Sequence, residues 1–485
     1  MRNAHYNMKR SRNNGYKRAG SRWNALPRPP RKPFFLAARL FCAYSSSAFA
    51  FYGPTPDGCP GLDHKQKEYP MKKMIGLVFA GSLLAGATLG WAAGYGILEG
   101  SARGNAMGTE VTADPASPSV IYNNPAAMTE LPGTQIEAGF TAIKPRQTVV
   151  SRTPWGNQYE HGRSQWWTIP NAYMTREVAD PIWFGLALGT RIGLGAEYPG
   201  AATWNGRYAV TRAEITSFEA TPSLAWKVCT NFSVAAGVRV QYFDFLLRRA
   251  VPTGQPFVDP DVSAELSGDN IELGYNVGAY WKALPWLSVG ASYLSEIKQQ
   301  IEGKYKVTTM DGGQQIAGGT CYGTFPSPAE FRLGTSIKAT DKLKVNLGLT
   351  YTFWNCYDQL RIHYDPAILG KSSVTTSKKN WHDTWRWQLG LEYALTEAWF
   401  ARCGYVYDKT PDPDYLIDYM VPANNRHIIS FGGGWKGEKV FCDFGYTYLI
   451  IEDRDVRGHI QDGIWDGSFQ DGNAHMVSAS VGYKF

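Results

Sequence analysis

The side chains of this 485-residue chain that could do covalent chemistry do not form a recognisable catalytic set. No Gly-x-Ser-x-Gly sequence occurs, and that motif presents the nucleophilic serine of many hydrolases on a sharp turn. A catalytic triad also needs a base and a third group that orients the base. Beyond residue 92 the histidines fall mainly in predicted loops or at predicted strand ends, without an evident partner set; they are His161, His363, His382, His427, His459 and His475. We therefore do not expect an enzyme.

The cysteines do not predict a metal site. Two of the seven, Cys42 and Cys59, precede the region in which we expect the folded protein. The spacing of the other five matches no zinc pattern, and an odd number cannot all pair within one chain. We expect small apolar or loop residues, and we leave open one disulfide between Cys321 and Cys356. The remaining three are Cys229, Cys403 and Cys442. No metal or other cofactor is expected.

Charged side chains instead predict ion pairs on one face of a sheet. Two predicted strands flank a tight turn at residues 395–399, and pairing them in register places Glu392 opposite Arg402. The same register places Arg386 opposite Asp408. Apolar residues alternate with these charges, so one face suits lipid and the other a polar lumen. The core of a soluble sandwich would rarely bury so many charges.

Strands of this kind recur along the chain. Segments of about ten residues alternate with period two, and they are separated by short turns on one side and longer polar loops on the other. From Thr134 to Phe485 this pattern predicts fourteen strands in seven hairpins. With an even number of strands, the first strand begins and the last strand ends on the same side of the membrane, the periplasmic side. The tight turns are expected near Asp180, Thr230, Pro285, Asp341, Glu397 and Gly437.

Two features favour a membrane barrel over a soluble one. Aromatic residues gather where strands meet the longer loops, as in a girdle at a membrane interface. They are Tyr242, Tyr293, Tyr351, Trp354, Tyr405, Tyr407, Tyr446 and Tyr448. The chain also ends in an alternating strand, 477–485, with a terminal Phe485. This end resembles the signal read by the barrel-assembly machinery, which we expect to be a partner during biogenesis.

An export signal precedes the strands. Residues 71–74 are basic, residues 75–89 are apolar, and residues 90–92 supply small residues for cleavage after Ala92. The apolar run is too short for a membrane-spanning helix, which needs about 20 residues. Residues 1–70 are rich in Arg, Asn and Pro. Either translation starts at Met71 and the start codon at Met1 has been assigned too early, or residues 1–70 are an unusually long leader that is removed with the signal.

The net charge changes when this leader is set aside. The whole chain has 49 basic and 42 acidic residues, but residues 1–92 hold 15 and 3 of them, leaving 34 against 39. The basic excess therefore belongs to the leader, and we expect no nucleic-acid partner.

The first segment after the signal resembles the N-terminal hatch of the FadL/TodX (OmpP1) family, outer-membrane transporters of long-chain fatty acids and aromatic hydrocarbons. The resemblance rests on the Ala93-Gly94-Tyr95 start, the small-residue run 100–104 and the Asn124-Pro125-Ala126 motif. Residues 381–386 and 403–414 also resemble family segments. The resemblance implies an all-β fold, a 14-stranded antiparallel transmembrane β-barrel plugged by a hatch, in the outer membrane of a Gram-negative bacterium. The domains are then a leader (1–70), signal peptide (71–92), hatch (93–133) and barrel (134–485).

The resemblance also implies a route for the ligand. The third and fourth outer loops, around 243–270 and 296–326, would form a capture groove, although their apolar residues could equally pack the loops together. A ligand in an inner pocket would move the hatch and leave sideways at a kink in the third strand, 183–190. The implied capture residues are Phe243, Phe245, Leu246, Leu247, Phe257 and Phe325; the gate residues are Ala93, Gly94, Tyr95, Asn124, Pro125 and Ala126; the lateral-opening residues are Phe184, Gly185 and Gly189. A plain turn into the first strand is the alternative for the gate motif.

The ligand class stays open. A fatty acid would need a basic partner, for which the candidates are Arg386, Arg402, Lys304, Lys306, Arg248 and Arg249, whereas a hydrocarbon would need none. A general diffusion porin and a structural or adhesin barrel are the alternatives to a gated transporter. We expect a monomer that contacts outer-membrane lipid and lipopolysaccharide.

Overall fold

The computed structural model describes residues 94–200, 202–370 and 372–485. The chain divides into two units, Met1–Tyr69 and Pro70–Phe485, and every described residue lies in the second. The expected leader, signal, cleavage site, first gate residue Ala93 and first two cysteines lie outside the described residues. Among those that are described, no helix is long and apolar enough to cross a membrane.

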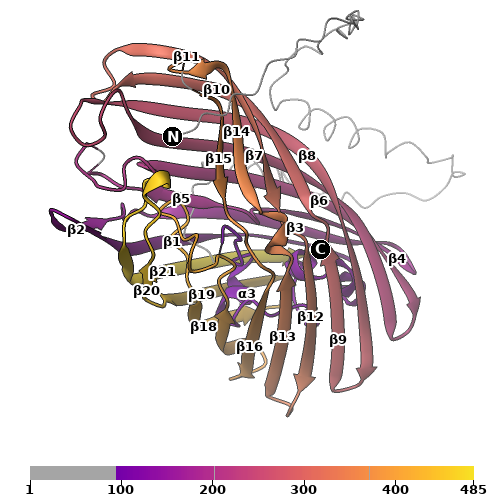
Figure 1. Cartoon of the computed structure of the whole chain (residues 1–485). Helices are drawn as coiled ribbons and strands as arrows, with labels where there is room; N and C mark the ends of the chain where they lie inside the picture. The colour runs from indigo at the N-terminus through magenta and orange to yellow at the C-terminus, as the bar shows by residue number, and fades with distance from the viewer. Residues whose placement is uncertain (1–93, 201, 371) are drawn as a thin grey trace, which may run out of the picture. The chain divides into compact units, whose positions relative to one another are not determined.

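The described residues from Thr134 onward form one closed antiparallel barrel of 14 strands, as predicted (Figure 1). The barrel closes where β1 pairs with β21 over nearly its whole length. The strands are β1 (Thr134–Thr153), β2 (Gly156–His161), β3 (Trp167–Ala179), β4 (Ile182–Gly189), β5 (Leu194–Glu197), β6 (Arg212–Cys229), β7 (Phe232–Pro252), β8 (Asp261–Leu284), β9 (Leu287–Leu294), β10 (Ile297–Thr309), β11 (Gln315–Ser327), β12 (Glu330–Lys338), β13 (Leu343–Thr352), β14 (Gln359–Ile368), β15 (Ser372–Lys378), β16 (Thr384–Ala394), β17 (Trp399–Asp408), β18 (Arg426–Lys436), β19 (Val440–Ile451), β20 (Arg454–Val456) and β21 (Gly467–Lys484).

The 21 segments make 14 strands because several strands are interrupted and two segments are short extras. The pairs β4/β5, β9/β10, β11/β12, β13/β14 and β15/β16 each form one strand in two pieces, while β2 and β20 lie at the long-loop end. All six predicted tight turns are present as short connections. The sequence segments 243–270 and 296–326, expected as loops, are mostly strand instead, because β7–β8 and β10–β11 pair as long hairpins.

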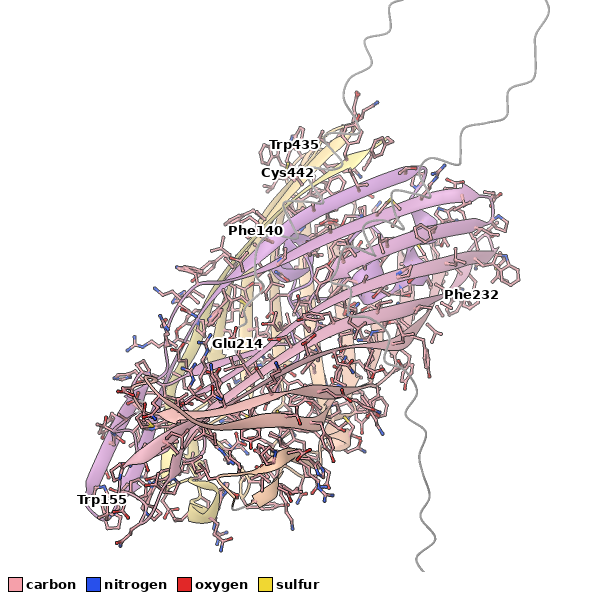
Figure 2. All side chains as sticks on the ribbon, turned by 90° about the horizontal axis from the view of Figure 1, so that it is seen from above. Phe140, Trp155, Glu214, Phe232, Trp435 and Cys442 are labelled. Atoms are coloured by element: carbon pink, nitrogen blue, oxygen red, sulfur yellow. The ribbon has the colours of Figure 1, made fainter. Side chains whose placement is uncertain are left out.

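The two faces of the wall differ as predicted. On β16 the outward side chains Trp385 and Trp387 are 41% and 44% exposed, whereas the inward Arg386 is 5% exposed. An apolar outer face with a polar lumen fits a strand that has lipid on one side only. Figure 2 shows the two ends of the barrel, with Trp155 at the long-loop end and Trp435 at the other. One expected girdle residue is placed differently: Trp354 is buried at 2% exposure, so it does not face lipid.

Residues 94–133, here called the N-terminal segment, hold most of the helical structure. The segment packs inside the barrel, where Figure 1 shows α3. Ser101 caps α3 through its side-chain oxygen, which accepts a hydrogen bond from the Gly104 amide at 3.0 Å. The helices of the described chain are α3 (Ala102–Ala106), α4 (Val120–Asn123), η1 (Pro125–Glu130), η2 (Trp354–Cys356) and η3 (Ile460–Asp462).

One interruption opens a gap in the wall. The third strand stops at Gly189 and resumes at Leu194, so residues 190–193 belong to neither β4 nor β5. The neighbouring strand β3 pairs with β4 only as far as the Ala172–Leu188 pair, and β5 pairs only with β6. The ladder between the second and third strands is therefore broken on the long-loop side of this point.

Candidate functional site

Buried ion pairs fix the N-terminal segment to the wall. Arg103 contacts Asp114 at 2.5 Å and Glu392 of β16 at 3.0 Å, and Lys344 of β13 contacts Asp114 at 2.9 Å. Arg402 of β17 contacts Glu392 at 2.8 Å, which is one of the two pairs predicted from register. Burial alone would raise the pKa of Asp114, but Arg103 and Lys344 hold that pKa below its usual range. Removing one member would strand a buried charge, which typically costs about 3–5 kcal/mol.

The other predicted pair joins the same lumenal network. Arg386 lies opposite Asp408 in the register, with 3.3 Å between the Arg386 Nε and an Asp408 carboxylate oxygen. Asp408 also binds Arg426 of β18, so two cations share this one carboxylate. Arg386 and Arg402 are thus each paired with a lumenal carboxylate, and the buried Arg386 Nε makes no hydrogen bond within the described chain.

A ring of inward-facing glycines gives the N-terminal segment its room. At each of these positions an added Cβ would lie 3.0 Å or less from an atom of that segment. Gly404 is the tightest against backbone, since its Cβ would lie 2.1 Å from the Gly108 nitrogen. At Gly290, Gly390, Gly404 and Gly445 the close atom belongs to the backbone of the segment, so glycine is needed there; at the other four positions the close atom belongs to a side chain of the segment. The ring, here called the glycine belt, comprises Gly278, Gly290, Gly334, Gly348, Gly390, Gly404, Gly432 and Gly445.

The predicted gate motif lies where α4 turns into η1. The Asn124 side-chain oxygen accepts a hydrogen bond from the Ala126 amide at 3.1 Å, and Pro125 occupies the first turn of η1. The Asn124 amide donates to the Thr112 carbonyl at 3.1 Å and to the Ala279 carbonyl of β8 at 2.9 Å. One buried asparagine thus joins the turn, the rest of the segment and the wall.

The start of the segment lies in an aromatic pocket. The Tyr95 ring centroid is 4.6 Å from that of Phe325, 4.8 Å from Trp354 and 5.4 Å from Trp381. The Tyr95 hydroxyl donates to the Pro326 carbonyl at 2.7 Å. Phe243 packs against Phe325 with centroids 5.3 Å apart. Two predicted capture residues, Phe243 and Phe325, therefore lie deep in the barrel around Tyr95 rather than at its mouth.

The same stretch of chain fills the gap in the third strand. Gly96 forms an antiparallel bridge with Ile192, the Ile97 amide donates to the Arg191 carbonyl at 2.8 Å, and the Gly193 amide donates to the Tyr95 carbonyl at 2.8 Å. The interruption lies just beyond the predicted residues Phe184, Gly185 and Gly189, all of which belong to the regular strand β4. Gly185 instead makes room for the N-terminal segment, because a Cβ there would lie 2.7 Å from the Met128 sulfur.

A cavity with a volume of about 480 Å³ lies at the mouth. Leu247 and Phe257, from the third outer hairpin, line it. The rest of the lining comes from Tyr208 and Ala209, from β14–β15 and from the loops 416–420 and 459–465, and none of it comes from residues 296–326. Of the other predicted capture residues, Phe245 borders a smaller pocket next to Phe325, and Leu246 is half-buried on the opposite face of β7 from Phe245.

Among the candidate carboxylate partners, Arg249 lies in this mouth cavity and its buried Nε has no hydrogen-bond partner in the described chain. Arg248 and Lys306 are both paired with Glu265. The five described cysteines are all free, so Cys321 and Cys356 form no disulfide. No group of three or more His, Cys, Asp or Glu side chains in the described chain is arranged to hold a metal ion.

Glu110 predicts a pH dependence of the seated segment. Its carboxylate faces Gly334 and Gly348 and accepts hydrogen bonds from Thr112. Burial raises the pKa of Glu110 to about 8; nearby Arg332 lowers this pKa and Asp114 raises it. Between about pH 4.5 and 8 the Glu110 carboxyl is therefore protonated while the segment is seated. When the segment leaves its seat, Glu110 loses that proton because its pKa returns to the ordinary 4.5. Seating should weaken as pH rises from about 4.5 to 8 and then level off.

Ion leak through purified protein in planar bilayers measures this effect. The leak should increase across that pH window in the unchanged protein and increase clearly less in the Glu110→Gln variant, which keeps its acceptor oxygen; burial also raises the pKa of Glu99 in the same segment, and that group still titrates in the variant. An equal rise in both proteins would contradict the assignment to Glu110.

Several residues that the sequence analysis did not select prove central: Tyr122, Arg191, Glu110 and the glycine belt. Tyr122 directly precedes the Asn123-Asn124-Pro125 run, which was the one signal that could have identified it. The belt glycines occupy inward positions of the predicted alternation, but glycine is frequent throughout these strands.

A 14-stranded barrel with an apolar outer face, a polar lumen and its own N-terminal segment packed inside defines an outer-membrane transport barrel. The model of the family "Outer membrane protein transport protein (OMPP1/FadL/TodX)" matches residues 83–485, and the chain belongs to this family. It is therefore a multi-pass outer-membrane β-barrel that transports hydrophobic compounds, and it is not an enzyme.

Individual relatives agree with this assignment. The long-chain fatty acid transport protein of Escherichia coli O6:H1 is 21% identical over 82% of this chain and 96% of its own length. The 47 kDa outer membrane protein of Pasteurella multocida is 24% identical over 68% of this chain and 80% of its own length. Among solved structures, a Pseudomonas aeruginosa FadL homologue has a TM-score of 0.71 at 20% identity, covering 81% of this chain and all of that one. The Pseudomonas putida toluene transporter TodX has a TM-score of 0.65 at 17% identity, covering 80% and 99%.

Proposed function

We propose that the protein takes up long-chain fatty acids or similar hydrophobic compounds through a gate formed by its N-terminal segment, and that the ligand leaves sideways through the wall. The observation that carries this proposal is the Gly96–Ile192 bridge. The stretch 95–97 occupies the aromatic pocket and also fills the gap in the third strand. One movement of this stretch would therefore empty the pocket and open the wall.

Capture would begin at the mouth cavity. Leu247, Phe257 and their neighbours offer apolar surface for a chain that is poorly soluble in water. The cavity volume of about 480 Å³ falls within the range typical of small-molecule sites. In this proposal the third outer hairpin lines the capture site, as expected. β14–β15 and the last two outer loops line it in place of the fourth outer hairpin.

Displacement of Tyr95 would be the gating step. An apolar ligand that enters between Phe325, Trp354 and Trp381 must take the place of the Tyr95 ring. The stretch then loses the Tyr95–Pro326 hydrogen bond, and its bridge to the third strand is left unsupported. Asn124 and Pro125 would hold the remainder of the segment in place while its start moves.

The mouth cavity favours an acidic ligand, because Arg249 can donate to a carboxylate there without breaking an existing hydrogen bond of its Nε. A second candidate is uptake of monoaromatic hydrocarbons, which is favoured by the aromatic lining around Tyr95. Relatives of both kinds are known, since one is named a fatty acid transporter and another a toluene transporter. A general diffusion porin fits less well, because such a pore would not hold a segment across its lumen.

The outer surface suggests how the protein lies in its membrane. The outward apolar side chains would contact outer-membrane lipid, and the outer hairpins would contact lipopolysaccharide. The barrel closes on itself through β1 and β21, so a monomer is sufficient.

Changing Asn124 and Pro125 to Ala together should abolish most gated uptake, because the cap of η1 and the bond to β8 are both lost. Residues 71–485 would be expressed in a Gram-negative host that lacks its own fatty-acid transporter, with surface assembly checked and uptake of labelled oleate and toluene compared. Pro132→Ala, at an exposed proline of the same segment, is the matched control.

The outcomes separate the candidates. Loss of oleate uptake supports the fatty-acid transporter, and uptake of toluene alone supports the hydrocarbon branch. Uptake of neither, together with steady ion conductance, would point to a porin. Unchanged uptake in a fully assembled double variant would contradict the gate.

A further inference from the structure

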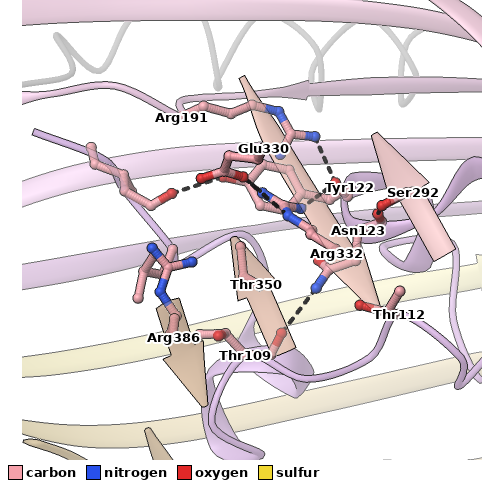
Figure 3. Close-up of polar contacts among 12 residues, drawn as sticks. Thr109, Thr112, Tyr122, Asn123, Arg191, Ser292, Glu330, Arg332, Thr350 and Arg386 are labelled. Carbon is pink, nitrogen blue, oxygen red and sulfur yellow. Dashed lines mark hydrogen bonds and ion pairs between the residues drawn. The ribbon is translucent and has the colours of Figure 1, made fainter. Parts of the chain in front are cut away.

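Arg191 lies in the gap of the third strand and contacts two separate parts of the N-terminal segment. Its carbonyl accepts a hydrogen bond from the Ile97 amide at 2.8 Å. Its guanidinium donates through Nη2 to the Tyr122 carbonyl at 2.6 Å, and the guanidinium carbon lies 3.8 Å from the Tyr122 ring centroid (Figure 3). A single residue of the wall thus holds both the start of the segment and the helix α4.

Tyr122 closes the same contact from the other side. Its hydroxyl lies 3.2 Å from the Ile97 carbonyl oxygen and 3.1 Å from the Thr190 carbonyl oxygen, and its one proton can serve either acceptor. Its ring fills the space beside Gly100, where an added Cβ would lie 2.4 Å from a ring carbon. Arg191 and Tyr122 therefore form one packed unit across the gap.

We propose that Arg191 is a positioning residue that latches the gate: through its contact with the seated α4 it holds residues 95–97 in the wall until a ligand displaces Tyr95. The proposal rests on the proposed function and adds the means by which the segment and the lateral opening are coupled. When a ligand displaces Tyr95, the bond from Ile97 to Arg191 is the next to break. The guanidinium is then held only by Tyr122 and Glu219, and the gap can widen without unseating α4.

The latch is arranged so that it can open. Glu219 contacts the Arg191 Nε at 3.0 Å, but it is also paired with Arg239 at 2.7 Å. Departure of Arg191 would therefore leave no buried carboxylate without a cation. The Arg191 Nη1 atom is buried and has no hydrogen-bond partner in the described chain, so the closed arrangement is not fully satisfied.

A second arginine holds Tyr122 without touching the gap. Arg332 of β12 donates to the same Tyr122 carbonyl at 3.1 Å and is paired with Glu330, as Figure 3 shows. Its position on an intact part of the wall makes it the matched control. Loss of Arg332 should loosen α4, whereas loss of Arg191 should loosen the gap.

The test measures how often the gap opens. Ile192 is 5% exposed, so a thiol placed there by Ile192→Cys, with the five other mature cysteines changed to serine, should be protected from a maleimide in purified protein. Arg191→Ala should raise its labelling rate about tenfold, the change expected for losing a hydrogen bond to a charged group. Arg191→Lys should raise the labelling rate less, because lysine keeps the positive charge beside Glu219 but lacks the several N–H donors of the guanidinium.

A second thiol separates a latch from general loosening. Thr129 lies in η1 and is buried at 3% exposure, so Thr129→Cys reports unseating of the rest of the segment. The latch predicts faster labelling at 192 with no change at 129. Oleate or toluene should also speed labelling at 192 in the parent, and Arg191→Ala should remove most of this dependence. Equal increases at both positions, or none at 192, would overturn the proposal.

Two further variants show whether a change in labelling comes from the latch or from misfolding. Tyr122→Phe removes only the hydroxyl contacts to Ile97 and Thr190 and should also speed labelling at 192. Arg163→Ala removes an exposed ion pair with Glu197 of β5 and should change nothing. Failure of Arg191→Ala to assemble would leave Arg191→Lys and Tyr122→Phe to decide the matter, and unchanged labelling in both would overturn the latch.

A disulfide lock tests the underlying function separately. Gly96 and Ile192 are bridge partners, and a Cβ at Gly96 meets only Trp354 at an ordinary 3.6 Å, so Gly96→Cys with Ile192→Cys should crosslink. Oxidation should stop uptake of oleate and toluene, and reduction should restore it. Continued uptake by the locked protein would refute lateral release itself, whereas a working lock with unchanged labelling in Arg191→Ala would refute only the latch.

Discussion

Deletion of residues 93–131 should turn the barrel into an open pore with steady ion conductance. In the intact protein the N-terminal segment contacts the glycine belt on eight strand segments, from β8 round to β19. Removing it would leave the inward charges Arg402, Glu392 and Asp443 facing water, and a polar lumen of this kind conducts ions. The wall itself should still close, because β1 and β21 pair without help from the deleted residues.

Planar-bilayer recordings on purified protein would measure this, with heat-modifiable gel mobility to show that the barrel has assembled. Pro132→Ala, which leaves the segment in place, provides the tight reference. A deleted but fully assembled barrel that remains closed to ions would mean that the outer hairpins, rather than the N-terminal segment, seal the lumen. In that event the mouth cavity would be the gate.

Much of the barrel could be predicted because its determinants are local. Side-chain alternation and short turns are properties of about ten neighbouring residues, and they fix strand positions and faces together. The tight turn before Trp399 sets the register of β16 and β17, and with it the Glu392–Arg402 and Arg386–Asp408 pairs. These pairs follow from the turn alone, without knowledge of any other strand.

The interruptions of the strands could not be predicted in the same way. Residues 190–193 have a sequence no less suited to a strand than their neighbours, and they leave the ladder because Gly96 and Ile97 pair with them instead. That partner lies almost a hundred residues earlier in the chain. Of the two glycines named for this strand, Gly189 is the last residue of β4, next to the interruption, and Gly185 lies against Met128.

The pocket around Tyr95 was hidden for a related reason. Tyr95 and its partners Phe325, Trp354 and Trp381 come from separate parts of the sequence, and each alone resembles an ordinary loop or girdle aromatic. Trp354 illustrates the difficulty, because it follows a strand directly, as a girdle residue would, yet η2 turns it inward. The composition of such a pocket depends on which loops fold into the lumen, and alternation within one strand carries no information on that.

Gly404→Val should unseat the N-terminal segment without breaking the barrel. A Cβ at Gly404 would lie 2.1 Å from the Gly108 nitrogen and 2.3 Å from the Met107 carbonyl carbon, and backbone atoms cannot rotate out of the way. Overpacking a well-filled core typically costs about 1–3 kcal/mol, and contact with backbone belongs at the upper end of that range. The segment must therefore shift as a body, which also pulls on the Arg103 ion pairs a few residues earlier.

We expect an ion leak approaching that of the deletion, together with new protease cleavage inside residues 94–133. Gly433→Val is the matched control, because Gly433 alternates with Gly432 on β18 and faces outward, with only the Phe400 carbonyl near its Cβ at 3.1 Å. If both variants leak, strand distortion and not the belt would be the cause. If only Gly404→Val leaks, the glycine belt is a shaped seat, and the tightness of this transporter depends on backbone contact between wall and segment as well as on ion pairs.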